Sequence, residues 1–497
     1  MKASKLITKT VVIAINLWIP ISSRNASDPF SIFQQSSHLL FASAASLLQQ
    51  APNSYFPNGH SIVPGTIPTG TLLYHACSTD QAPTGFEWLA FDPEMSYGVV
   101  AGRGGPAILF TYLAKRPLRV IYFDGNSGAL RPTGWLDSQY LLFYSEIPTP
   151  EGSSSPELMD DYSRAKEMCE QSQQWGFEGV VRMNVGFEVI WCDFTMGLEL
   201  IRRINITDPF SSPGYGFPPT PDSPDRAPEF PAGGLSVFPS SPFAITAPWE
   251  WQRSATWHYE SPGEARVQLD YSSMVSFYDG VDSLARKRIQ DHTVANRREQ
   301  RLLGISPSDV KVVQARLRKI LAQKEKEGWT TCADKVDWKT LLRTITNHYS
   351  GRLNAMSEVL NLANDHLNAT AGALSIRQLT YGALMPYFDM ADDKSNLSDS
   401  GSTTLSHCSK AFTKAFYFTS LSVTPSEKAL IGAIEGTLTG LCQTLIEVFV
   451  ETIEDFSKDY SMNDILRWKN KIENLIKWLG WPEWHGCSKK CGKDVSY

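Results

Sequence analysis

The sequence predicts an α+β domain, a proline-rich linker and then an all-helical domain. From residue 65 to about 200, short β-branched or aromatic runs alternate with Gly, Pro and Asp, which is typical of strands and turns. Residues 208–249 contain eleven prolines, and helical spacing of apolar residues begins after Val267. At 497 residues the chain is longer than a single hydrophobic core usually supports, so we expect two domains.

The N-terminus has the layout of a secretory signal. Lys2, Lys5 and Lys9 precede an apolar run over 11–21, interrupted by Asn16 and Pro20. This run is shorter than the roughly 20 apolar residues that a membrane span needs. We therefore expect residues 1–23 to be a signal peptide or signal anchor, with membrane association through the N-terminus. The protein would then be secreted or would reside in the endoplasmic reticulum or endomembrane lumen.

Cysteines and sequons are compatible with that compartment. The chain has eight cysteines, an even number that suits disulfides, although the sequence does not specify their pairing. Cys487 and Cys491 lie close together beside His485, but no second ligand pair completes a zinc site, so a local disulfide or free thiols are favoured over a metal. Four Asn-x-Ser/Thr sequons predict glycosylation at Asn25, Asn205, Asn368 and Asn396.

The α+β domain is expected over 60–207. Four segments read as strands because they are β-branched or aromatic and bounded by turn residues: 70–74, 106–113, 118–123 and 187–194. Residues 156–175 have the apolar spacing of a helix. This mixture predicts a mixed sheet with at least one packed helix.

The linker is expected over 208–249. Its prolines remove hydrogen-bond donors and disfavour helix, so the segment should be extended. Six Phe and Tyr residues within it suggest that it packs against a surface, and a flexible spacer is the alternative.

The helical domain is expected over 265–460, followed by a cysteine-containing tail over 461–497. Ser306 begins a helix predicted to end at Glu327. Thr424, Pro425 and Glu427 form a helix-start signal before a long apolar stretch. Because that stretch contains Glu435 and Glu447, each costing about 2.5–3.5 kcal/mol near the centre of a membrane span, it is better read as the central helix of a bundle.

The composition narrows the function classes. A net charge of −6 gives no reason to expect a nucleic-acid partner. The sequence lacks the Gly-x-Ser-x-Gly, His-Glu-x-x-His, phosphate-loop and Gly-x-Gly-x-x-Gly signatures. Several common catalytic mechanisms therefore lose their main support.

One set of residues could carry chemistry. His75 ends the run GTLLYH, Tyr97 closes FDPEMSY, and Glu188 heads FEVIWCDF. At these points the sequence resembles the His-Tyr-Glu layout of ADP-ribosyltransferases of the poly(ADP-ribose) polymerase type. The resemblance implies that NAD is the substrate, with His75 on its adenosine ribose, Tyr97 stacked on nicotinamide and Glu188 polarising the nicotinamide ribose. A carboxylate there would stabilise a cationic sugar electrostatically.

This resemblance makes a geometric prediction. His75 and Glu188 should lie on neighbouring strands with both side chains in one cleft, and Tyr97 should cover that cleft. Because successive strand residues face opposite sides, Tyr74 and Val189 should point away from it.

The chain also resembles a family of uncharacterised fungal secreted or endomembrane proteins from about residue 65 to 456. The phrases GTLLYH, EWLAFDPEMSY, RPLRVIYFDG, GFEVIWCDF, LDYSSMVSFYD and TPSEKAL carry this resemblance. It implies the localisation and the co-occurrence of both domains, and no activity.

Two other function classes stay open. A carbohydrate-active hydrolase would use two carboxylates about 5–10 Å apart, with tryptophans as stacking platforms. The residues available for this role are Glu87, Asp92, Glu94, Asp124 and Asp137, with Trp88 and Trp135. Alternatively, the α+β domain is a non-catalytic scaffold and the helical domain an interaction module.

Overall fold

A computed structural model gives the fold. It describes residues 29–100, 106–129, 133–148, 161–207, 250–290, 297–329, 336–365, 369–388, 401–418, 422–453 and 460–485. The expected signal (1–23) and linker (208–249), the sequons at Asn25, Asn368 and Asn396, and the pair Cys487 and Cys491 lie outside these residues. The described part is an α+β protein with a mixed sheet and a helical C-terminal region.

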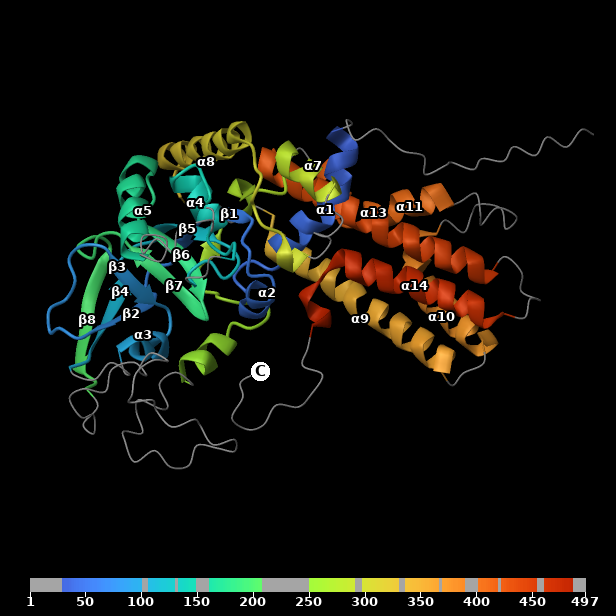
Figure 1. The fold of residues 1–497 in the computed structure, drawn as a ribbon, viewed down its shortest axis with the longest axis horizontal. Coiled ribbons are helices and arrows are strands. Elements are labelled where there is room, and N and C mark those ends of the chain that lie inside the picture. Colours follow the sequence, from blue (N-terminus) through green and yellow to red (C-terminus); the bar gives the residue numbers. More distant parts are fainter. Residues whose placement is uncertain are drawn as a thin grey trace, which may run out of the picture.

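The sheet has ten strands, most of which are labelled in Figure 1. The order is β10-β1-β5-β6-β7-β3-β2-β4-β8, and β9 also pairs with β1. All described pairs are antiparallel except β5 with β6. The strands are β1 (Ser61–Ile67), β2 (Leu72–Cys77), β3 (Glu87–Ala90), β4 (Ile108–Ala114), β5 (Leu118–Phe123), β6 (Gly179–Asn184), β7 (Gly186–Trp191), β8 (Leu198–Asn205), β9 (Gln268–Leu269) and β10 (Val275–Ser276). β2, β4, β5 and β7 correspond to the four predicted strands, which are confirmed.

The two faces of the sheet are buried by different helices. Leu73, Leu89, Phe110 and Val189 share one core with the N-terminal helix and the bundle. Ile190 belongs to a second core on the other face. That core is covered by α4 (Asp137–Phe143), α5 (Asp161–Trp175) and α8 (Pro307–Glu327), which lie over the sheet in Figure 1. Near β2 and β4, α3 (Pro93–Val100) packs on this second face.

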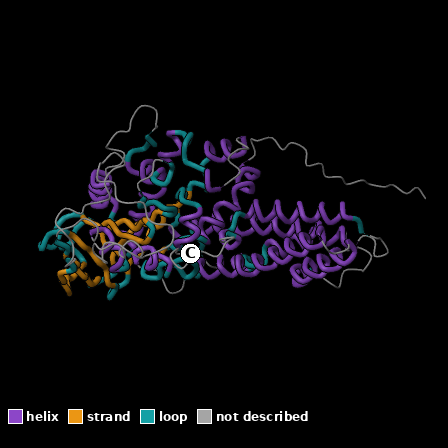
Figure 2. Tube along the Cα trace, turned by 60° about the horizontal axis from the view of Figure 1, so that its bottom comes forward, coloured by secondary structure: helices purple, strands orange, loops and turns teal. Residues whose placement is uncertain are grey.

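The helical region is an elongated bundle beside the sheet (Figures 1 and 2). Its helices are α1 (Pro29–Ala45), α9 (Trp338–Asp365), α10 (Ala369–Leu384), α11 (Gly401–Ser409), α13 (Pro425–Ile453) and α14 (Met462–Leu479). The shorter elements are α2 (Gln50–Tyr55), α7 (Asp282–Gln290), α12 (Ala415–Phe418), η2 (Tyr271–Ser273), η4 (Arg297–Glu299), η5 (Met385–Tyr387) and η6 (Pro482–Trp484).

The predicted helix starts are confirmed. The Ser306 hydroxyl accepts from the backbone N–H of Asp309 at the start of α8. At the start of α13, the Thr424 hydroxyl accepts from the Glu427 N–H at 3.2 Å, and the Glu427 carboxylate accepts from the Thr424 N–H at 2.8 Å. This reciprocal pair is a capping box.

Among the residues that the structure describes, α13 is the one helix long and apolar enough to cross a membrane, and half of that apolar window is buried. It packs against α1, α10 and α11. Its Glu435 accepts hydrogen bonds from Thr413 and Tyr417, and Glu447 accepts one from Lys471. These contacts give α13 the environment of a central bundle helix.

The boundaries between the two regions differ from the expected ones. Residues 268–276 return to the sheet as β9 and β10, and α8 covers it, so the bundle does not begin at 265. Helix α14, within the expected tail, packs against α9 and α13, and α1 joins the bundle from the N-terminal side. One continuous core runs from the sheet into the bundle. The sheet region and the helical bundle therefore share one hydrophobic core.

Two disulfides connect elements distant in sequence. Cys169 on α5 is bonded to Cys192, just after β7, and Cys408 on α11 is bonded to Cys442 on α13. The first fastens a covering helix to the sheet. The second fastens two bundle helices.

Candidate functional site

The expected His-Tyr-Glu cleft does not form. Strand β3 lies between β2 and β7, so His75 and Glu188 are not on neighbouring strands. Tyr74 pairs with Ala90, and Ala90 pairs with Glu188. Directly paired residues share a face, so Glu188 faces the same side as Tyr74, and His75 faces the other.

His75 is a buried histidine that is hydrogen-bonded within the protein. Its Nδ1 donates to the backbone carbonyl of Trp88 at 2.8 Å, and its ring packs near Phe110 and Phe194. Burial lowers the pKa of His75, so the ring is neutral at pH 7. Tyr97 lies on α3, which packs on the opposite face.

Glu188 belongs to a buried ion network. Its Oε1 accepts from Arg182 Nη2 at 2.5 Å, and Arg182 is fully buried. The same guanidinium holds Asp161 through two bonds of 3.0 Å, and Arg164 also pairs with Asp161. Burial raises the pKa of Glu188, although Arg182 acts against this. The network has the form of a structural ion cluster under α5.

Three of the carboxylates that a carbohydrate-active hydrolase would use are also buried and hydrogen-bonded or ion-paired within the protein. Asp124 accepts from the Ser61 N–H at 2.7 Å and from Ser43, and burial raises its pKa to about 6. Asp137 is paired with Arg301. Asp92 belongs to another ion cluster.

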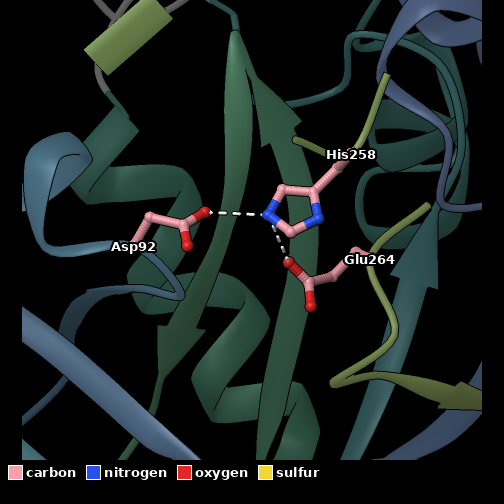
Figure 3. A group of neighbouring side chains, drawn as sticks. All are labelled: Asp92, His258 and Glu264. Atoms are coloured by element: carbon pink, nitrogen blue, oxygen red, sulfur yellow. Dashed lines mark hydrogen bonds and ion pairs between the residues drawn. The ribbon is translucent and has the colours of Figure 1, made fainter. Parts of the chain in front are cut away.

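The ion cluster around Asp92 comprises Asp92, His258, Glu264 and Arg266, and we call it the Arg266 cluster. Asp92 follows β3, and the other three residues lie in the segment that leads to β9. Backbone bonds attach that segment to the chain after α1, including one from the Glu264 N–H to the Leu48 carbonyl at 2.7 Å. Figure 3 shows the imidazole of His258 between the carboxylates of Asp92 and Glu264.

Asp92, His258 and Glu264 have the chemistry of metal ligands, and their donor atoms lie within 4.8 Å of one another. However, Arg266 Nη2 lies 2.9 Å from Asp92 Oδ1, 3.0 Å from His258 Nε2 and 2.7 Å from Glu264 Oε2. The guanidinium therefore occupies the position that a cation would take. Its charge compensates Glu264, which is fully buried.

The Arg266 cluster sets the charge state of its histidine. Burial lowers the pKa of His258, but the hydrogen bond to Asp92 and the charge of Glu264 outweigh burial and raise the pKa overall. Asp92 shows the opposite balance: burial raises its pKa, and His258 and Arg266 bring it below its usual range.

A cavity of about 480 Å³ lies where the sheet region meets the bundle, and we call it the junction cavity. Residues 47–48, 265, 267–272, 336–339 and 427 line it. Its apolar wall includes Leu48, Val267 and Trp338. Ligand pockets typically have about 300–1,000 Å³ and favour such junctions.

Most charged groups of the junction cavity already have partners. Asp270 binds Lys324. Glu427 accepts from Trp338 Nε1 at 3.1 Å as well as from the helix start. Asp337 accepts from the Thr340 N–H at 3.0 Å. Asp270 and Glu427 are also buried, which leaves their carboxylates little capacity for a ligand, whereas Asp337 is exposed.

Lys339 is different. Its ammonium makes no hydrogen bond or ion pair within 4 Å with any residue that the structure describes. Burial lowers its pKa, while the charges of Asp337 and Glu264 raise it. The junction cavity and the Arg266 cluster are thus electrostatically connected through Glu264.

Sequence patterns did not single out His258, Glu264, Arg266 or Lys339. The run HYESPGEAR over 258–266, directly after the proline-rich segment, places a histidine, two acids and an arginine within nine positions. That density is a weak local signal, and Asp92, 166 positions away from His258, is absent from it.

The fold and these features define an α+β protein with a fused helical bundle, buried ion clusters and one junction cavity among its described residues. A family model described as the YPL277C N-terminal domain matches residues 30–106 and 101–222.

Relatives in Saccharomyces cerevisiae extend this match. The chain is 24% identical to the uncharacterized protein YOR389W over 525 aligned residues, covering 92% of this chain and 80% of that protein. It is 31% identical to the uncharacterized protein YPL277C over 213 residues, covering 34% of this chain and 43% of that protein. No solved structure matches the chain. The matches support a relationship with an uncharacterised fungal protein family.

Proposed function

We propose that the chain is a non-catalytic binding protein of the secretory pathway whose ligand occupies the junction cavity. The observation that carries this proposal is a cavity of ligand size with an apolar wall and the ammonium of Lys339, which has no contact partner among the described residues. A small molecule with an acidic group and an apolar part fits this chemistry. The acidic group would meet Lys339, and the apolar part would displace water from Leu48, Val267 and Trp338.

Titration calorimetry with a panel of aliphatic and aromatic carboxylates tests the binding site. Ala265 is exposed and lines the cavity, so Ala265→Phe should fill it without disturbing the core. Lys339→Met should remove the attraction for the acidic group. Lys326→Met, an exposed lysine at the end of α8, is the matched control. Binding that is equally tight in Ala265→Phe and wild type would refute the site.

Residence in the secretory pathway is supported by the two disulfides, which persist in oxidising compartments. It also depends on the expected signal over 1–23 and on the sequons. Expression with and without residues 1–23, followed by glycosidase treatment and thiol labelling, tests it. A full-length product with reduced cysteines, a cytosolic location and no mobility shift would exclude this localisation.

An NAD-dependent transferase or NAD glycohydrolase is the other reading, and NAD as a substrate stays a prediction. The opposite orientations of His75 and Glu188 favour the binding protein over this reading. Nicotinamide release from NAD by purified protein decides between them, because only the transferase reading expects turnover that Glu188→Gln abolishes.

A further inference from the structure

Two arginines, Arg288 and Arg297, lie beside Tyr278. The guanidinium carbon of Arg288, on α7, lies 4.4 Å from the centre of the Tyr278 ring. Arg297, on η4, has its guanidinium 4.3 Å from the ring centre of Phe56 and also interacts with the Tyr278 hydroxyl. Both side chains therefore meet at the same tyrosine.

One terminal nitrogen of each arginine is buried without a partner. Arg288 Nη2 and Arg297 Nη1 are shielded from solvent and have no hydrogen-bond partner among the residues that the structure describes. Among the described residues, no carboxylate oxygen lies within 4 Å of either guanidinium. An arginine cannot discharge itself by losing a proton at physiological pH, so a buried one needs a compensating anion.

The acidic groups near Arg297 do not fully neutralise the charges of the two arginines. Asp124 acts on Arg297 only through its field, because its oxygens are bound to the Ser61 N–H and the Ser43 hydroxyl. Glu483 also acts on Arg297 through its charge, but its carboxylate is ion-paired with Arg343. The third basic group nearby, His60, is buried with Nδ1 bonded to the Asn58 carbonyl and stays neutral, since burial holds its pKa well below the usual range. Among the described residues, the two partly buried arginines therefore leave a net positive charge beside Tyr278.

We propose that Arg288 and Arg297 form a binding site for a small oxyanion, either inorganic phosphate or sulfate. Guanidinium groups present planar pairs of N–H donors that match the oxygens of such an anion. The anion would satisfy both orphan nitrogens and neutralise the excess charge. It would also link α7 and η4 to the start of β1.

Thermal unfolding of the full chain at constant ionic strength, with increasing inorganic phosphate replacing chloride, tests this proposal. The expected result is a Tm that rises with the logarithm of phosphate concentration in wild type. Arg288→Gln and Arg297→Gln should each abolish the rise. Arg286→Gln is the matched control, because Arg286 is exposed on the same helix and bonds only to the Asp282 carbonyl among described residues; it should respond like wild type.

Two further measurements separate this site from a stacking role. Without phosphate, Arg288→Gln should be at least as stable as wild type, since it removes an uncompensated buried charge. Equilibrium dialysis with labelled phosphate, and then labelled sulfate, should give one site per chain in wild type and none in either variant. Loss of stability in Arg288→Gln with an unchanged phosphate response would show that the arginine only stacks on Tyr278. Equal dialysis results for wild type and both variants would also overturn the site.

Discussion

His75 and Glu188 face opposite sides of the central sheet, with strand β3 between their strands. Each is buried and held by its own partner, His75 by the Trp88 carbonyl and Glu188 by Arg182. Both side chains therefore have the environment of residues that stabilise the fold. The consequences can be measured as changes in stability.

Glu188→Gln should destabilise the fold. The substitution removes one of the two charges that compensate Arg182 among the described residues and leaves Asp161 as the other. Losing a hydrogen bond between charged groups typically costs about 1.5–3 kcal/mol. Urea unfolding measures this loss, with Glu199→Gln on the exposed edge strand β8 as the control, expected to change stability by less than about 0.5 kcal/mol. A Glu188→Gln variant as stable as the control would contradict the structural role.

Arg266→Met should be more damaging. Among the described residues, it leaves the fully buried Glu264 and the nearby Asp92 with His258 as their contacting cationic partner, while Lys339 acts on Glu264 from a greater distance. Breaking a buried pair by removing one partner costs about 3–5 kcal/mol. Arg253→Met, which removes an exposed ion pair with Glu250, should change stability by less than about 1 kcal/mol. Addition of Glu264→Gln to Arg266→Met should restore part of the loss, and no recovery would argue against uncompensated charge as the cause.

His258 should make stability depend on pH. Its folded pKa is raised above the unfolded value of about 6.5. Its favourable contribution is therefore fully present below about pH 6.5 and is lost as the pH rises through the folded pKa. Urea unfolding between about pH 6 and 8.5 should show the advantage of wild type over His258→Gln shrinking with rising pH. An advantage that stays constant or grows would rule out this assignment.

Asn205 should carry a glycan if the chain enters the secretory pathway. It is exposed at the end of β8, and its side-chain oxygen accepts from the Thr207 N–H at 2.9 Å. In a secretory expression host, Asn205→Gln should remove one glycosidase-sensitive mobility step. Thr207→Ser keeps both the sequon and the hydroxyl that binds the Ala107 N–H, so this control should keep that step. Identical mobility of wild type and Asn205→Gln would show that the site is not used.

Local chemistry determined the elements that the sequence predicts well. The β-branched and aromatic run over 118–123 forms β5, and the reciprocal signals of Thr424 and Glu427 begin α13. Such features depend on neighbours within a few positions, so one sequence is enough to recognise them. The sequence does not predict β1, because Pro64 and Gly65 both disfavour strands. The Pro64 carbonyl nonetheless accepts from the Asp270 N–H at 2.9 Å, a bond that a distant segment supplies.

Only the tertiary structure decided which residues meet. Alternation along a strand places Glu188 and Val189 on opposite faces of the sheet. It does not tell whether Glu188 lies on the same face as His75, which belongs to another strand. That depends on β3 pairing between β2 and β7. The Arg266 cluster has the same origin: the contact between Asp92 and His258 spans 166 positions. Long-range strand pairing and burial bring such groups together, and no local pattern encodes their distance.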